Sequence, residues 1–467
     1  MMKWKVFTLL MMLLTTLSSG QNHNLTLLGR WDNDDLPVDD FEAYNDIWAW
    51  HDGNGKEYAI MGSLDSVYFI DVTNPAKPIV SDVEAGKWKN CIHRDFKTYG
   101  NYCYAVADEG YSSLQIFDMS HLPDSVHKVY DSDTLMVRSH NVFIDGKRLY
   151  LATCTSKSDF VPLRVLSLEN PTRPTFLYDL RGPVVGGKPL FREVHDLFAR
   201  NDTVYCNTGD DGLFIYVYSD SLEKSNSDST WKVSKPNMTL LTSLTKYSSQ
   251  GYNHSCWLSV DGKHMVMQDE THGTKLKMLQ LEPGDIPEEV STFGSNSSKG
   301  SVPHNAFIYK KKVFVSYYHE GVLVYDISDP EAPEEFARYD TYPQNNDYEG
   351  LYGCWGVYPF LPSGNILASD QLNGLHIFSL ATGLDNDYSG AQFNLYPNPV
   401  VSELSIELSI PIEEWTLELY DISGRNVLQM GIQGSVAKID VKELESGLYV
   451  ARLKSSDFEY SGRIIIR

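Results

Sequence analysis

Short apolar stretches of strand length recur along almost the whole chain, among them LYLATC, HMVMQD and VFVSYY. Turn signals such as Asp145-Gly146-Lys147 and Asp261-Gly262-Lys263 separate them, and residues of these types favour tight turns between strands. The 3.6-residue spacing of an amphipathic helix is absent from these segments. The pattern therefore predicts an all-β protein.

The stretches are organised in a unit of about fifty residues that occurs seven times. Each unit begins with a polar residue, then Asp, Asn or Ser, and then apolar or aromatic residues. A turn, two further strands, a proline-containing turn and a more polar fourth strand follow. Seven units of four strands are typical of a β-propeller, whose blades must stack because one blade cannot bury both of its faces. The units begin at Asn45, Arg94, His140, His195, His254, His304 and, in a degenerate copy, Trp355.

The seventh unit ends after its third strand, at Leu380, so its fourth strand is missing there. Residues 25–32 (LTLLGRWD) match the fourth strand of the sixth unit (EEFARYD) in pattern and in the Arg-aromatic-Asp ending. We therefore expect the N-terminal strand to complete the last blade, which removes open sheet edges. Residues 25–380 are predicted to form a seven-bladed β-propeller closed by an N-terminal strand.

The two ends of the chain carry different signals. Lys3 and Lys5 precede an apolar run and then small residues, so residues 1–20 are predicted to be a signal peptide. Residues 381–392 (ATGLDNDYSGAQ) are polar and predict a linker. Residues 393–467 contain short stretches such as TLELYD, in which apolar and polar positions alternate, and predict a small β-sandwich.

Several ordered motifs mark this last segment: Tyr396-Pro397-Asn398-Pro399, the turn Tyr420-Asp421-x-x-Gly424, Ser446-Gly447-x-Tyr449 and a short apolar–basic end. With these motifs, residues 393–467 resemble the type A sorting domain of the type IX secretion system of Bacteroidetes. The resemblance implies recognition by the type IX secretion machinery and passage through the periplasm. It also implies that the protein is secreted or attached to the outer cell surface.

A second resemblance concerns the repeat. Its marks are YNDIWAW, YNHSCWLSVDGK, WGVYPFLPSGNILASD and the Asp/Ser-x-x-Asn/Asp-Pro-x-x-Pro turns. Residues 25–380 resemble the LVIVD-repeat propellers of the choice-of-anchor B family of secreted bacterial proteins. That family has no established molecular activity, so the resemblance implies an architecture and not a function.

Composition narrows the choice of partners. The 467 residues include 62 acidic and 39 basic side chains, for a net charge of −23. Phosphate groups would be repelled and the basic residues are scattered, so we expect no nucleic-acid partner. After removal of the signal peptide, no transmembrane segment is expected. The six cysteines show no CxxC spacing, and the sequence assigns no disulfide pairing.

Histidine is the most informative residue type, because four histidines begin four consecutive units and should gather at one mouth of the central channel. Converging imidazoles could ligate a divalent metal, although hydrogen bonding between strands would also explain a repeated histidine. Carboxylates after the second strands are expected nearby. The candidate metal ligands are His140, His195, His254 and His304. The candidate ligand-binding residues are His93, Arg94, Glu109, Glu270 and Glu320.

Three functions follow from these features. The first is an exported binding protein that recognises a glycan, a peptide or another surface protein through the loops of one face. The second is a metal-dependent enzyme that uses the histidines and carboxylates at the channel mouth. The third is a structural component of the cell surface, which predicts a mouth without unpaired polar groups.

Overall fold

The computed structural model describes residues 22–224, 231–282, 284–298, 300–344, 347–381, 393–396, 400, 402–408, 414–421, 425–434, 436–454 and 459–466. Every regular element within these residues is a β-strand, as the sequence predicted. The predicted signal peptide (residues 1–20) lies outside the described part of the chain. So does the predicted linker, apart from its first residue.

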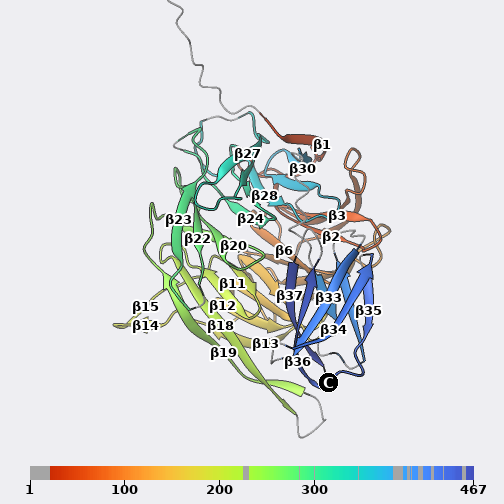
Figure 1. The fold of residues 1–467 in the computed structure, drawn as a ribbon. Helices are drawn as coiled ribbons and strands as arrows, with labels where there is room; N and C mark the ends of the chain where they lie inside the picture. Colours follow the sequence, from red (N-terminus) through yellow and green to blue (C-terminus); the bar gives the residue numbers. More distant parts are fainter. Residues whose placement is uncertain are drawn as a thin grey trace, which may run out of the picture.

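Seven four-stranded antiparallel sheets form a ring of blades, which confirms the predicted seven-bladed propeller. In Figure 1 the labels of the innermost strands lie around the centre of the ring, and those of the outer strands lie at its edge. Blades 1 to 3 are β2 (Tyr44–His51), β3 (Glu57–Ser63), β4 (Ser66–Asp71) and β5 (Ile79–Ala85); β6 (Arg94–Tyr99), β7 (Tyr102–Ala107), β8 (Leu114–Asp118) and β9 (His127–Ser132); and β10 (Asn141–Asp145), β11 (Arg148–Thr155), β12 (Phe160–Ser167) and β13 (Thr175–Leu180).

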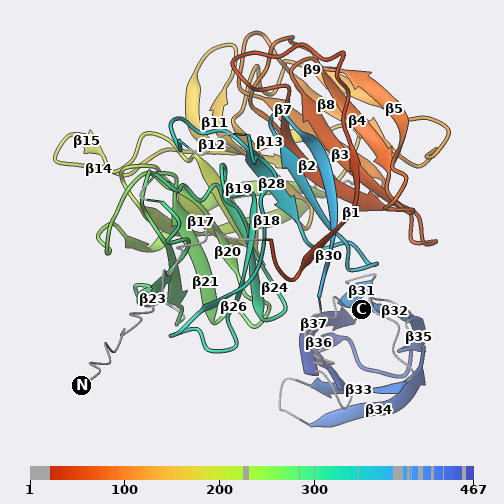
Figure 2. The same ribbon diagram turned by 90° about the horizontal axis from the view of Figure 1, so that it is seen from above.

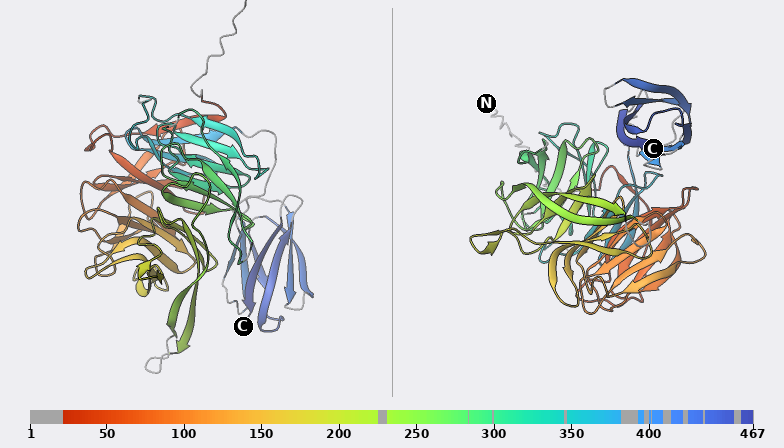
Figure 3. Two further views of the ribbon diagram at one scale, coloured as in Figure 1. Left: turned by 90° about the vertical axis from the view of Figure 1, so that its left-hand side faces the viewer. Right: turned by 90° about the horizontal axis from the view of Figure 1, so that it is seen from below.

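Blades 4 to 6 follow the same order, and a short hairpin, β14 (Val184–Val185) with β15 (Lys188–Pro189), precedes them. Their strands are β16 (Asp196–Arg200), β17 (Thr203–Asn207), β18 (Leu213–Lys224) and β19 (Trp231–Leu244); β20 (Asn253–Leu258), β21 (His264–Asp269), β22 (Leu276–Gln280) and β23 (Glu288–Phe293); and β24 (Asn305–Tyr309), β25 (Lys312–Ser316), β26 (Val322–Asp326) and β27 (Glu334–Tyr339). Figure 3 shows the long β18–β19 hairpin projecting beyond the ring.

Blade 7 consists of β28 (Cys354–Tyr358), β29 (Ile366–Asp370), β30 (Gly374–Leu380) and the N-terminal strand β1 (Leu25–Trp31). The register of β1 against β30 runs from Leu25 opposite Leu380 to Trp31 opposite Leu375, with one register shift. The outer strand pair of each other blade carries a register shift too. The N-terminal strand is therefore a regular fourth strand, and the predicted ring closure is confirmed.

Apolar side chains between adjacent blades hold the ring together. One cluster joins Ile60 and Phe69 of blade 1 to Phe96 and Phe117 of blade 2, and all four side chains are completely buried. Burial of this kind stabilises each side chain by about 1.5–3 kcal/mol relative to exposure. Because both faces of a blade are covered in this way, no blade is expected to fold without its neighbours.

The innermost strand of each blade starts at one face of the ring, which we call the mouth face. The loops that lead into each innermost strand, and the loops between second and third strands, also lie there. Strand β30 starts at this face and runs away from it, so Ala381 leaves the propeller at the opposite face. In Figure 2 the C-terminal domain is a separate body beside the ring.

The C-terminal residues form two antiparallel sheets, which confirms the predicted small β-sandwich. One sheet is β31-β32-β35 and the other is β34-β33-β36-β37. Alternating residues of the two sheets, such as Trp415, Leu417 and Leu404, are buried between them. The strands are β31 (Phe393–Tyr396), β32 (Glu403–Leu408), β33 (Glu414–Asp421), β34 (Asn426–Gln433), β35 (Val436–Asp440), β36 (Gly447–Lys454) and β37 (Glu459–Ile466).

Acid is expected to weaken the closing blade through His376. The His376 side chain is 3% exposed, and His376 lies opposite Arg30 of β1 in the sheet. Burial, and then the charge of Arg30, lower the pKa of His376 to about 3. The unfolded chain takes up this proton near its ordinary pKa of 6.5, whereas the folded chain does not. The free energy of unfolding should therefore fall below about pH 6.5, by up to about 1.4 kcal/mol per pH unit for this group.

Denaturant melts between about pH 7 and about pH 4 test this expectation. In the variant His376→Phe, the free energy of unfolding should fall less steeply with decreasing pH than in wild type. The variant His51→Ala changes an exposed histidine and should show the wild-type dependence on pH. Equal slopes in wild type and His376→Phe would contradict it.

Candidate functional site

Five imidazoles and one indole form a closed ring at the mouth face. We call this ring the histidine crown. Neighbouring ring centroids lie 4.2–5.5 Å apart all the way round. The ring thus brings together the four candidate metal ligands and one candidate ligand-binding residue. In order, its members are His93, His140, His195, His254, His304 and Trp355.

The repeat places these side chains at equivalent positions. The backbone N–H groups of His140, His195 and His304 each donate to a carbonyl of the second strand of their own blade. These bonds extend the inner strand pair by one residue at the mouth, so the side chains reach the channel at the same depth. In blade 2 the residue one position earlier, His93, reaches the crown instead of Arg94.

One pair of imidazoles is tightly held. The Nδ1 atom of His140 lies 2.9 Å from Asp108 Oδ2, and that of His195 lies 3.0 Å from the Tyr252 hydroxyl. The Tyr252 hydroxyl donates a hydrogen bond to Glu193 Oε1 at 2.6 Å, so its oxygen accepts a hydrogen bond from the Nδ1–H of His195. The two remaining atoms, His140 Nε2 and His195 Nε2, are 3.1 Å apart.

The other side of the crown has the same organisation. His93 Nδ1 lies 2.6 Å from Glu109 Oε1. His304 Nδ1 donates to the backbone carbonyl of Trp355, because a carbonyl can only accept. In both residues the Nδ1 atom already has a partner, so Nε2 is the ring nitrogen that remains to bind a ligand.

Glu270 supplies a carboxylate to the crown. Its two oxygens lie 3.9 Å from His254 Nε2 and 3.9 Å from His304 Nε2, and the Tyr318 hydroxyl donates to it. Burial raises the pKa of Glu270. The ligand atoms of His195, His254 and Glu270 all lie within 4.8 Å of one another, so small side-chain movements would let one ion contact them all.

The imidazoles differ in their protonation. Burial, and then the nearby histidines, lower the pKa of His195 and His254 well below the ordinary value. Burial lowers the pKa of His304 to about 3. Burial also opposes the charged form of His140, but the hydrogen bond and charge of Asp108 outweigh it and raise the pKa of His140. Most of the crown is therefore neutral at pH 7 and able to ligate a metal.

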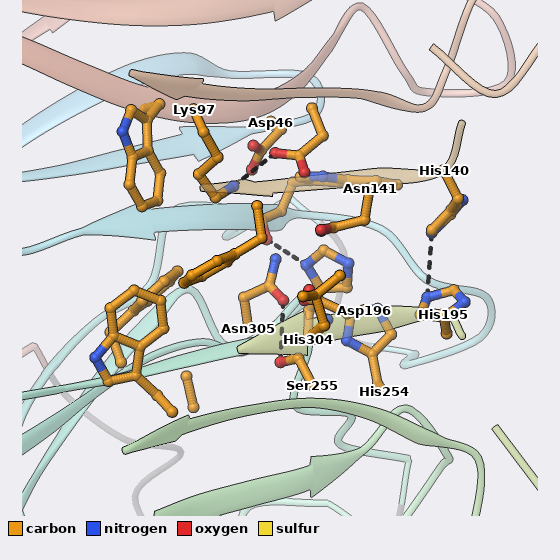
Figure 4. Close-up of a pocket in the computed structure, with 18 of the residues that line it drawn as sticks. Asp46, Lys97, His140, Asn141, His195, Asp196, His254, Ser255, His304 and Asn305 are labelled. Carbon is orange, nitrogen blue, oxygen red and sulfur yellow. Dashed lines mark hydrogen bonds and ion pairs between the residues drawn. The ribbon is translucent and has the colours of Figure 1, made fainter. Parts of the chain in front are cut away.

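A cavity of about 60 Å³ lies in the channel beneath the crown. Figure 4 shows a polar layer next to the imidazoles and large aromatic side chains beyond it. Phe360 packs against the aromatic layer, with its ring 5.5 Å from that of Trp257. The polar layer consists of Asp46, Asp95, Asn141, Asp196, Ser255 and Asn305, and the aromatic layer of Trp48, Phe143, Phe198, Trp257 and Phe307.

One cation offsets the acidic groups of the polar layer. Lys97 Nζ lies 2.9 Å from Asp95 Oδ1 and 4.3 Å from the centroid of the Trp48 ring. Burial and the charge of Asp95 raise the pKa of Asp46 well above its ordinary value, and burial raises the pKa of Asp196 to about 7. This interior therefore retains protons on carboxyl groups near neutral pH.

Two of the candidate ligand-binding residues are used elsewhere. The Arg94 guanidinium donates to the backbone carbonyls of Ser63, Leu64 and Trp88. Glu320 accepts from Arg338 at 2.6 Å, and both side chains are buried. These contacts hold both side chains within the propeller, and their role in ligand binding stays a prediction.

Sequence reasoning missed several residues of the site. Trp355 occupies the histidine position of the seventh repeat and closes the crown. Lys97 stands where five other repeats have Trp or Phe, and alignment of the repeats could have revealed both. Tyr252 and Glu193 lie in loops of unequal length, which carry no repeat signal.

The C-terminal segment matches a known family. Residues 394–467 match the secretion system C-terminal sorting domain. The match indicates export through the type IX secretion system and a cell-surface or secreted location. It covers the last segment alone, so the resemblance of residues 25–380 to the LVIVD-repeat propellers stays a prediction. No curated protein sequence matches the chain.

Three solved structures are similar to the chain, and the first of them supports the propeller fold. The chain is similar to a chain in the crystal structure of the mitotic checkpoint complex, with 11% identity, coverage of 79% of this chain and 99% of that one, and a TM-score of 0.50. It is also similar to the periplasmic gluconolactonase of Pseudomonas aeruginosa, with 10% identity, coverage of 85% of this chain and 99% of that one, and a TM-score of 0.48. A third similar structure is a putative 6-phosphogluconolactonase from Bacteroides uniformis, with 11% identity, coverage of 84% of this chain and 98% of that one, and a TM-score of 0.46. At these identities the likeness concerns the propeller fold and no activity.

No helix in the described ranges is long and apolar enough to cross a membrane. All six cysteines are buried and unpaired, so the propeller is held together without disulfides.

Proposed function

We propose that this chain is an exported binding protein that holds a saccharide at its mouth face. The observation that carries the proposal is a set of buried polar atoms at this face without a hydrogen-bond partner. Buried polar atoms normally have partners, and a group of them without partners beside an open face is consistent with a water or a ligand there. The atoms are Glu109 Oε2, Asn141 Oδ1, His319 Nε2 and Gln371 Oε1.

Exposed aromatic side chains next to Glu109 favour a saccharide. Trp88 is 42% exposed and Tyr111 is 78% exposed, and their ring centroids are 6.3 Å apart. Trp88 packs on Gly110, where a Cβ atom would lie 2.2 Å from the indole. Sugar rings stack on such aromatic faces, and their hydroxyl groups bond to carboxylates such as that of Glu109.

The position of this face also favours recognition. The chain leaves the propeller towards the sorting domain from the opposite face, so the linker does not start from the mouth. A purely structural component is expected to have a mouth whose polar groups are all paired, and the four atoms above argue against that alternative. The alternative of a metal-dependent enzyme draws support from the histidine crown.

A glycan array probed with the full exported chain tests the proposal. The double variant Trp88→Ala with Tyr111→Ala should lose at least about tenfold in affinity for any glycan bound, which is about 1.4 kcal/mol. Phe176→Ala removes an aromatic residue of similar exposure (52%) near the opposite face, and it should bind like wild type.

Two results would contradict the proposal. One is a wild-type chain that binds no glycan on the array but binds a surface protein, which would favour a protein ligand instead. The other is glycan binding that the mouth variants leave unchanged.

A further inference from the structure

We propose that the histidine crown holds one divalent transition-metal ion of the zinc class, ligated by His140, His195, His254 and Glu270. The inference deepens the proposed function, because it places a metal in the same mouth, and it rests on that function for its biological role. It can be tested without any saccharide.

The first argument is the orientation of two imidazoles. Asp108 and Tyr252 engage the Nδ1 atoms of His140 and His195, so each ring in its neutral form directs the lone pair of Nε2 towards the other at 3.1 Å. Two facing lone pairs at this distance repel each other unless a positive charge lies beside them. That charge can be a shared proton or a metal ion.

The second argument is the spacing of the donor atoms. With metal–nitrogen distances of 2.0–2.1 Å and tetrahedral geometry, two ligand atoms on zinc lie about 3.3 Å apart. The Nε2 atoms of His140 and His195 are 3.1 Å apart, and His254 Nε2 lies 3.9 Å from Glu270 Oε2. The separations between the donor atoms of His195, His254 and Glu270 do not exceed 4.8 Å. Small side-chain adjustments would bring the donors of His195, His254 and Glu270 onto one ion, with His140 Nε2 beside His195 as the fourth donor.

The third argument is the set of groups behind the ligands. Histidines that ligate a metal almost always donate their other N–H to a carboxylate, a carbonyl or a similar acceptor, which fixes the ring and increases its basicity. His140 has Asp108 behind it, and His195 has Tyr252, which is itself bonded to Glu193. The Nδ1 atom of His254 is buried without such a partner. The Tyr318 hydroxyl holds Glu270 in the same way.

The donor types select the class of ion. Three imidazole nitrogens with one carboxylate suit Zn²⁺ and its neighbours in the transition series, whereas Ca²⁺ and Mg²⁺ require oxygen ligands. Four protein ligands fill a tetrahedral site, so an incoming oxygen of a bound molecule would reach the ion by displacing one of them. A saccharide hydroxyl is such an oxygen, which connects the metal to the proposed ligand.

The experiment uses the full exported chain, stripped of metal by a chelator and then titrated with Zn²⁺ and, separately, with Co²⁺. We expect one equivalent of Zn²⁺ to bind and to raise the melting temperature. Co²⁺ should give the intense visible absorption of a tetrahedral site. His195→Ala and Glu270→Gln should each weaken Zn²⁺ binding at least tenfold. His127→Ala changes an exposed histidine outside the crown and should bind as wild type.

Several outcomes would overturn the inference. One is the absence of stoichiometric binding to a folded chain, which would leave a shared proton between His140 and His195. Another is binding that His195→Ala and Glu270→Gln leave unchanged. If His195→Ala fails to fold, Glu270→Gln and the Co²⁺ spectrum decide. Glycan binding by a chain that binds no Zn²⁺ would refute the metal and leave the proposed function standing. Zn²⁺ binding by a chain that binds no glycan would refute the proposed function and leave the metal site standing.

Discussion

A chain that begins at Asp32, and so lacks β1, is expected to lose its cooperative unfolding transition and to aggregate. Without β1, the outer edge of β30 is left with unpaired backbone groups, and exposed edges pair with other molecules. The buried side chain of Leu25 also leaves a cluster that contains Phe314 of blade 6 and Phe378 of blade 7. The segment before β1 contacts blade 6 as well, through two backbone hydrogen bonds between His23 and Arg338.

A point variant tests the same closure without a deletion. A Cβ atom at Gly29 would lie 1.9 Å from the backbone carbonyl oxygen of Pro75 in blade 1, and backbone cannot move aside as a flexible side chain can. Gly29→Val should therefore destabilise the protein by about 3 kcal/mol or more. Thr26→Val, at an exposed position of the same strand, should change stability by no more than about 0.5 kcal/mol.

Denaturant melts and light scattering measure both effects. Wild-type melting of the shortened chain would show that the ring does not depend on β1. Gly29→Val and Thr26→Val with equal stability would show that β1 does not dock against blade 1 as the structure describes.

The repeat made the fold predictable. A repeat of about fifty residues, read seven times, sets the number of blades, and the truncated seventh copy requires a strand from elsewhere. The match between residues 25–32 and EEFARYD was sufficient because a fourth strand has the same packing environment in every blade. The β14–β15 hairpin was not foreseen, because it lies in a loop that only one repeat has.

The candidate site was predictable in part, for the same reason. Histidines at equivalent repeat positions must reach the channel at the same depth, and four of them do. Arg94 and Glu320 have the right positions, but their side chains find stronger partners close by. Glu320 meets the buried Arg338 on β27, and such pairing depends on a contact between strands that repeat spacing does not reveal.

A buried ion pair of blade 5 leads to the second large expected effect. Lys277 Nζ lies 2.6 Å from Asp269 Oδ2, and both side chains are completely buried. Asp269 also accepts hydrogen bonds from the Tyr247 hydroxyl at 2.8 Å and from the Gly251 N–H at 2.9 Å. Asp269 is the last residue of β21 and precedes Glu270, so this network fixes the backbone from which Glu270 reaches the crown.

Lys277→Met should lower the free energy of unfolding by about 3–5 kcal/mol, because it leaves the Asp269 carboxylate buried without its cation. Asp269→Asn should have a comparable effect through the uncompensated ammonium. The double variant should lose less than the sum of the two, since neither charge then remains. Lys147→Met is the matched control: Lys147 lies 3.0 Å from Glu169, but the two side chains are 58% and 64% exposed. That change should cost no more than about 1 kcal/mol.

Denaturant melts of wild type, Lys277→Met, Asp269→Asn and the double variant form a double-mutant cycle that measures these energies, and Lys147→Met is melted beside them as the control. Additive effects of Lys277→Met and Asp269→Asn would show that the pair does not act as a unit. Because Glu270 follows Asp269 directly, the folded fraction of Asp269→Asn should also bind Zn²⁺ more weakly than wild type, whereas Lys147→Met should bind it normally. Unchanged Zn²⁺ binding by Asp269→Asn would mean that this network stabilises blade 5 without positioning Glu270.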